Sequence, residues 1–106
     1  MATAAAPLEL KESSPGKFEA RGRLVFVTAK RARESGMAAF GATGAREIQV
    51  DCSGITASDS AGMTVLLDWL AVAKRSGRSL HFGSLPAQVQ AIARISDVLE
   101  LLEHGV

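Results

Sequence analysis

The residues best placed to do chemistry in this chain are Ser58, Asp59 and Ser60, which come just before a strongly apolar segment. That segment predicts a helix over residues 60–76, so Ser60 would sit at a helix N-terminus. Free backbone N–H groups and the helix dipole favour an anion there, and a phosphate on Ser60 would be held well. It would add about −1.5 to −2 charges beside Asp59, which can abolish partner binding without unfolding the domain. The alternative is that one of the three side chains only caps the helix, which stabilises it by ~1 kcal/mol.

Other residues that could carry chemistry are few. Cys52 is the only cysteine, which excludes an internal disulfide, and His81 and His104 are the only histidines. These residues lack the number and spacing of an ordinary metal site, and no histidine can be placed beside Cys52 to activate it. Residues 41–44 lack the lysine and the spacing of a phosphate-binding loop. We therefore expect no catalytic residue, no metal, no cofactor and no hydrolysis of ATP or GTP.

Length, charge and the start of the chain narrow the class of protein. The 106 residues are 47% apolar, which suits one globular domain, expected over residues 7–106 after a tail over residues 1–6 that we expect to be flexible. A net charge of +1 is too balanced to indicate a nucleic-acid partner. We find neither a signal peptide nor an apolar run near the ~20 residues of a spanning helix. We expect a cytoplasmic protein that meets a membrane only through a partner complex.

The elements expected to position Ser60 are a hairpin followed by alternating helices and strands. The predicted strands cover residues 8–12, 18–27, 48–52 and 80–82, and the predicted helices cover residues 29–40, 60–76, 86–95 and 98–104. Thr28 is expected to cap the first helix, Gly77 to end the second, and Ser96 or Asp97 to cap the last. Strands separated by helices of this length favour parallel neighbours, so the sequence predicts an α/β fold around a mixed sheet of four or five strands, with residues 48–52 in the middle.

The helix that starts at Ser60 carries two apolar stripes, although a helix lying on one sheet needs only one. The broader stripe, assigned to the core, comprises Met63, Leu66, Leu67, Leu70 and Ala73. The second comprises Ala61, Val65, Trp69 and Val72. It either packs against a neighbouring helix or forms an exposed patch around the only Trp, a residue enriched at binding hot spots. An exposed patch would adjoin Ser60 and form one partner-binding surface. That surface would comprise Asp59, Ser60, Ala61, Gly62, Val65, Trp69 and Val72.

Two segments resemble the STAS family, the fold of bacterial anti-sigma-factor antagonists. They are residues 22–29, Gly-Arg-Leu-Val-Phe-Val-Thr-Ala, and residues 50–63, in which a strand ending in Val-Asp leads to an Asp-Ser-x-Gly turn. The resemblance implies a central sheet with helices mainly on one face, no enzymatic activity, and a Ser or Thr open to phosphorylation at the position of Ser60.

Within this family the chain is also similar to the MlaB group, cytoplasmic accessory subunits of the phospholipid-transporting ABC complex that maintains outer-membrane lipid asymmetry. That group often carries Thr-Gly-Gly where this chain has Ser60-Ala61-Gly62, a sequence closer to the antagonists. Two functions follow from the resemblance. In one, the domain binds and regulates the ATPase subunit of the transporter; in the other, it captures an anti-sigma-factor kinase until Ser60 is phosphorylated. We favour the first, and both make the chain a protein-binding domain.

Overall fold

The computed structural model describes residues 7–106, and the tail expected over residues 1–6 lies outside the described residues. The order of elements is β1 (Glu9–Ser14), β2 (Lys17–Leu24), α1 (Phe26–Ala42), β3 (Glu47–Ser58), α2 (Ser60–Arg75), β4 (Ser79–Gly83), α3 (Ala87–Ile95) and α4 (Leu99–His104). The predicted α/β order of a hairpin followed by alternating helices and strands is confirmed.

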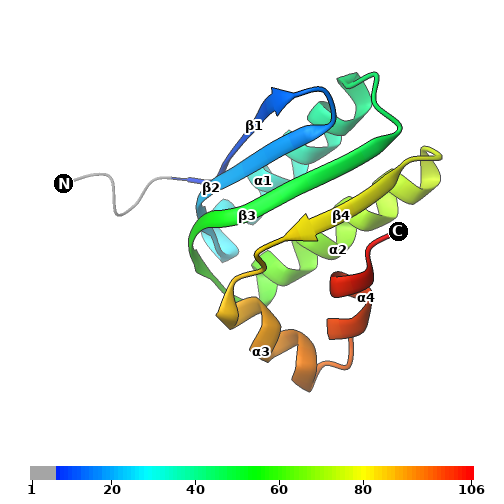
Figure 1. Ribbon diagram of the computed structural model, residues 1–106. Coiled ribbons are helices and arrows are strands. Elements are labelled where there is room, and N and C mark those ends of the chain that lie inside the picture. Colours follow the sequence, from blue (N-terminus) through cyan, green and yellow to red (C-terminus); the bar gives the residue numbers. More distant parts are fainter. Residues whose placement is uncertain (1–6) are drawn as a thin grey trace.

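The described strands form one mixed sheet of four strands in the order β1-β2-β3-β4 (Figure 1). β1 and β2 pair antiparallel as a hairpin, whereas β2 with β3 and β3 with β4 are parallel pairs. Parallel neighbours need a crossover, and α1 and α2 supply the two that this sheet requires. The prediction of a mixed sheet with residues 48–52 in an inner strand is therefore confirmed.

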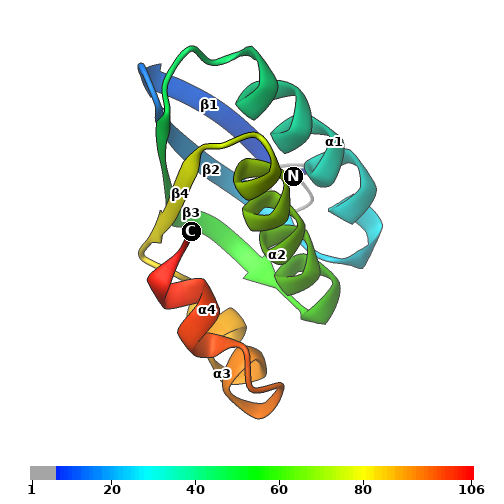
Figure 2. The ribbon, with the colours of Figure 1, turned by 90° about the vertical axis from the view of Figure 1, so that its right-hand side faces the viewer.

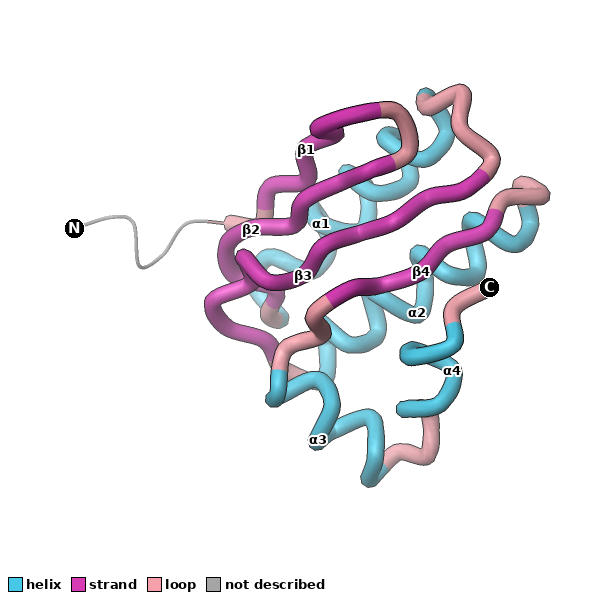
Figure 3. The backbone as a smooth tube through the Cα atoms, in the orientation of Figure 1, coloured by secondary structure: helices cyan, strands magenta, loops and turns pink. Residues whose placement is uncertain are grey.

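The helices leave one face of the sheet open. Figures 1 and 2 show α1 and α2 side by side on the other face, with α3 and α4 beyond the β4 edge, and Figure 3 shows the strands uncovered on the near side. Side chains alternate accordingly, because successive residues of a strand point to opposite faces. In β3, Ile48 and Val50 are buried in the core, while Gln49 and Asp51 are exposed on the open face.

α1 packs closely on α2 because Gly36 leaves room for the indole of Trp69. A Cβ added at Gly36 would lie 2.1 Å from Trp69 Nε1. Trp69 is fully buried, and its ring meets Phe40 edge-on with centroids 5.6 Å apart. The second apolar stripe of α2 therefore packs against α1, and the predicted exposed patch around Trp69 is wrong.

The start of α1 also differs from the prediction. β2 ends at Leu24 and α1 begins at Phe26, so Val25 to Val27 do not continue the strand, and Thr28 lies inside the first helical turn. The Thr28 hydroxyl accepts a hydrogen bond from the N–H of Val25 (3.1 Å) and donates one to the carbonyl of Arg23 (2.7 Å). Thr28 thus stabilises the helix start from its third position, and the helix begins three residues earlier than expected.

The ends of α2 and β3 and the start of α4 can also be compared with the sequence prediction. Gly77 follows α2 with a φ of 71°, the left-handed geometry predicted for it. β3 continues to Ser58, well past residue 52, because β2 pairs with it from Gln49 to Ser58. Neither Ser96 nor Asp97 caps α4, which begins after Val98; Asp97 instead has a φ of 64° in the turn from α3. Both predicted caps of this helix are wrong.

Candidate functional site

Asp59 is the single residue between β3 and α2, and its carboxylate serves the first turns of two helices. Oδ1 accepts a hydrogen bond from the N–H of Gly62 in α2 (2.9 Å), and Oδ2 accepts one from the N–H of Phe26 in α1 (3.0 Å). Of the three residues that could cap α2, the structure therefore selects Asp59. The two helices consequently begin side by side, although they are far apart in the sequence (Figure 2).

Ser60 is the first residue of α2, at the helix N-terminus where the sequence placed it, and it is exposed. Ser58, before it, is buried at the end of β3. Small residues follow Ser60. Ala61 is half-buried, whereas Gly62 is buried against β2, where an added Cβ would lie 2.0 Å from the carbonyl oxygen of Leu24. Gly62 thus seats the helix on the sheet, and its predicted contact with a partner is wrong.

The exposed apolar side chains beside Ser60 come from α1 rather than α2. Phe26 is 77% exposed and Val27 76% exposed, both in the first turn of the helix that Asp59 joins to the start of α2. Such exposure of two adjacent large apolar residues is typical of a binding surface, because it has no role in the fold of the free domain. The sequence analysis missed these two residues because an apolar run of valine and phenylalanine is equally typical of the end of a strand.

A groove of about 510 Å³ runs from Phe26 along the junction of α1 and α2. Its lining residues are Phe26, Ala29, Lys30, Arg33, Ala61, Thr64, Val65 and Asp68. Val65 is buried at its floor and Val72, further along α2, is half-buried. Of the predicted partner-binding residues, Ala61 and Val65 thus line this groove, and Asp59 and Ser60 directly precede Ala61 at the start of α2.

Basic side chains line the α1 side of this groove. Lys30 and Arg33 are exposed, and Arg33 Nε lies 3.1 Å from Asp68 Oδ2 of α2. Both partners of that ion pair are about half exposed, so the pair adds little to stability. Arg31, next to Lys30, is exposed as well. The surface around Ser60, Phe26 and Val27, called the corner below, is therefore apolar at its centre and basic at its margin.

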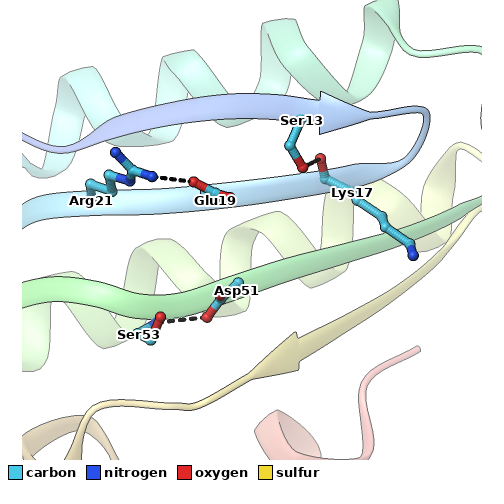
Figure 4. Close-up of polar contacts among 6 residues, drawn as sticks. All are labelled: Ser13, Lys17, Glu19, Arg21, Asp51 and Ser53. Carbon is cyan, nitrogen blue, oxygen red and sulfur yellow. Dashed lines mark hydrogen bonds and ion pairs between the residues drawn. The ribbon is translucent and has the colours of Figure 1, made fainter.

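The open face of the sheet offers a different kind of hollow, of about 450 Å³, lined by polar side chains of all four strands. Figure 4 shows local polar contacts on this face: Glu19 pairs with Arg21 along β2, and Asp51 contacts Ser53 along β3. The Asp51 carboxylate accepts a hydrogen bond from the N–H of Ser53. This backbone hydrogen bond holds the pKa of Asp51 below its usual value. Such a face is ordinary for a sheet with one solvated side. We do not assign a site to it.

The residues considered for catalysis do not form a catalytic group. Burial raises the pKa of the Cys52 thiol to about 12, which keeps it neutral and unreactive. His81 and His104 are exposed, on β4 and α4. Among residues 7–106, no three His, Cys, Asp or Glu side chains are grouped closely enough to hold a metal ion. No helix in this part of the chain has the length and the apolar character to span a bilayer.

Comparison with known proteins agrees with this arrangement. The family model described as "Mlab, STAS domain" matches residues 11–103, and the chain belongs to this family of STAS domains. Domains of this family are typically non-catalytic and bind proteins.

Among solved structures, the anti-sigma factor antagonist SpoIIAA in its unphosphorylated form has a similar fold. The TM-score is 0.63 at 12% sequence identity, and the match covers 83% of this chain and 82% of SpoIIAA. No curated protein sequence is a significant match. The expected STAS fold, with helices mainly on one face, is thus confirmed.

Proposed function

We propose that this chain is a cytoplasmic accessory subunit that binds the ATPase subunit of an ABC phospholipid transporter through the corner formed by Ser60, Phe26 and Val27. The observation that carries the proposal is the exposure of this apolar pair next to the start of α2, where the family resemblance places the switch residue Ser60. Membership of the Mlab family supports this choice of partner. The domain adds no catalytic group of its own and acts by contact.

Contact at this corner is suited to regulation. The apolar centre supplies area that is removed from water, and Ser60 places a hydroxyl at the edge of that area. A phosphate on Ser60 would put a strongly solvated charge into the contact, which weakens binding while the fold stays intact.

The alternative function is an anti-sigma-factor antagonist released from its kinase by phosphorylation of Ser60. It is supported by the Ser60-Ala61-Gly62 sequence and by the likeness to SpoIIAA, itself an anti-sigma factor antagonist. The two functions use the same corner of the molecule and differ in the partner. A serine kinase that binds this chain and modifies Ser60, but not a Ser60→Ala variant, would favour the alternative.

The test is a calorimetric titration of the full chain with an ABC ATPase subunit from the same organism. Phe26→Ala should weaken binding about thirtyfold or more, as expected for an aromatic hot spot, and Ser60→Glu should weaken it through charge. Ile95→Ala is the matched control, because Ile95 is 87% exposed at the end of α3, away from this corner. Thermal melts of all three variants should stay near that of the native chain. Equal losses for Phe26→Ala and Ile95→Ala would exclude this corner, and absence of binding by the native chain would exclude the partner.

A further inference from the structure

The two oxygens of the Asp59 carboxylate bind the first turns of different helices. The N–H of Gly62 belongs to α2, which carries Ser60, and the N–H of Phe26 belongs to α1, which carries the exposed apolar pair. Both N–H groups are donors that a helix leaves without an internal partner at its start. Hydrogen bonds to a charged acceptor are stronger than those between neutral groups. One side chain therefore connects the two halves of the proposed contact surface.

The first turn of α1 has a second fastening, which holds it to the sheet. The Thr28 hydroxyl donates a hydrogen bond to the carbonyl of Arg23 at the end of β2, and the side chains of Phe26 and Val27 are largely exposed to solvent. Thr28 thus fixes this turn to its own strand, while Asp59 fixes it to α2. Of these two fastenings, the second connects the apolar pair directly to the residue that precedes Ser60.

We propose that Asp59 is a positioning residue of this surface. Its carboxylate holds Phe26 and Val27 in place relative to Ser60, and a negative charge at Ser60 acts by weakening the hydrogen bond between Asp59 and Phe26. The inference rests on the proposed function of the corner as a contact surface. A phosphate or glutamate at residue 60 would stand beside the Asp59 carboxylate, repel it, and compete for the same N–H groups. A surface held in its binding geometry before contact binds more tightly, because less order is lost on binding.

Replacing Asp59 with asparagine should keep one of the two hydrogen bonds and remove the other. It has the shape of aspartate and is an equally good helix cap, so it can still accept the N–H of Gly62. Its second atom is an NH₂ donor, which cannot accept the N–H of Phe26. Asp59→Asn should therefore release the start of α1 and leave α2 capped. Asp97→Asn is the matched control, because Asp97 is exposed in the turn before α4 and asparagine tolerates its φ of 64°.

The first measurement is backbone hydrogen exchange of the full chain, followed for each amide by NMR, with no partner present. In Asp59→Asn, exchange at Phe26 should rise about tenfold or more, while Gly62 and the interior amides of α2 keep their protection. Asp97→Asn should change none of them. Equal exchange at Phe26 in the two variants, or an equal rise along the whole of α2, would overturn the proposal. If Asp59→Asn does not fold, Asp59→Ser answers the same question, since its single oxygen can cap α2 but cannot also reach α1.

The second measurement tests whether a charge at Ser60 acts through the hydrogen bond between Asp59 and Phe26. Ser60→Glu should speed exchange at Phe26 in the native background and add nothing in the Asp59→Asn background. Additive effects would overturn this part of the proposal. With the ATPase subunit as probe, Asp59→Asn should bind about tenfold more weakly than Asp97→Asn, and equal affinities would overturn the positioning role. If the native chain does not bind the ATPase, the proposed partner fails, while the exchange result still decides whether Asp59 ties the two helices.

Discussion

Replacing Gly36 with alanine should destabilise the protein, although alanine is the better helix former. Gly36 is buried in the middle of α1, where it faces the indole of Trp69. At an exposed helical position the same change stabilises a protein by roughly 0.5 to 1 kcal/mol, because glycine loses more backbone freedom on folding. The sign of the effect at Gly36 therefore depends on whether packing outweighs helix propensity.

The geometry indicates that packing outweighs propensity. The new Cβ would lie 2.1 Å, 2.4 Å and 2.6 Å from three atoms of the Trp69 ring, where ordinary contacts are 3.4–4 Å. Trp69 has no room to retreat, because it is fully buried and meets Phe40 edge-on. Overpacking of this kind costs about 1–3 kcal/mol, and the closeness of three ring atoms places this case near the upper end. After the gain in propensity, we expect a net loss of about 2 kcal/mol.

Gly41 provides the matched control in the same helix. Nothing lies within 4 Å of the position that its Cβ would take, and the residue is exposed. Gly41→Ala should therefore stabilise the protein slightly, by at most about 1 kcal/mol, so the two alanine variants should differ by about 3 kcal/mol in opposite directions.

Urea unfolding of the native chain and both variants measures this difference. Gly36→Ala should lower the midpoint and Gly41→Ala should leave it unchanged or raise it. A third variant, Gly36→Ala with Trp69→Phe, should recover part of the loss, because the smaller ring vacates space. If Gly36→Ala proves as stable as the native chain, the close packing of α1 on α2 is not as described. Trp69→Ala alone should cost about 3–5 kcal/mol, the usual loss for a core Trp.

Two further predictions concern pH. The pKa of Glu12 is held below its ordinary value because its carboxylate accepts the N–H of Gly16 and the hydroxyl of Thr43. Its contribution to stability is present above the unfolded pKa and is lost as pH falls through the lowered folded value, so thermal melts between about pH 5 and 2 should decline less for Glu12→Gln than for the native chain. Burial raises the pKa of the Cys52 thiol from an ordinary 9.0 to about 12. The contribution of the neutral thiol to stability is therefore complete below the unfolded pKa, and the free energy of unfolding should fall as the pH rises from the unfolded pKa to the folded pKa. A thiol reagent at about pH 8 should label Cys52 only after unfolding, and rapid labelling of the folded chain would contradict its burial.

Local patterns in the sequence predicted most of the fold. The alternation in Ile48 to Cys52 and the two stripes of α2 follow from which side chains must avoid water, and Gly77 follows from backbone sterics. These signals lie within one element, so they can be read without knowing the neighbours. The position of Ser60 at the start of α2 was predicted in the same way.

The exposed part of the candidate site could not be predicted, because distant residues decide it. Trp69 was a candidate for an exposed patch, but Gly36 of α1 covers it. Phe26 was expected in a strand, but the hydroxyl of Thr28 and the carboxylate of Asp59 turn the chain into a helix there. Both outcomes depend on the docking of α1 beside α2. The second stripe of α2 was consistent with a neighbouring helix, but it did not show which segment of the chain would cover it.

The hydrogen bond from Phe26 to Asp59 spans 33 positions of the chain and requires β2 and β3 to be already paired in parallel. Pairings between distant residues form late in folding, because a long loop must close first. The corner that carries Ser60 should accordingly be among the last regions to mature. A synthetic peptide copying α2 should not compete for the partner, and an antibody raised against this corner should recognise only the folded chain, which makes such an antibody a sensor of correct folding during expression.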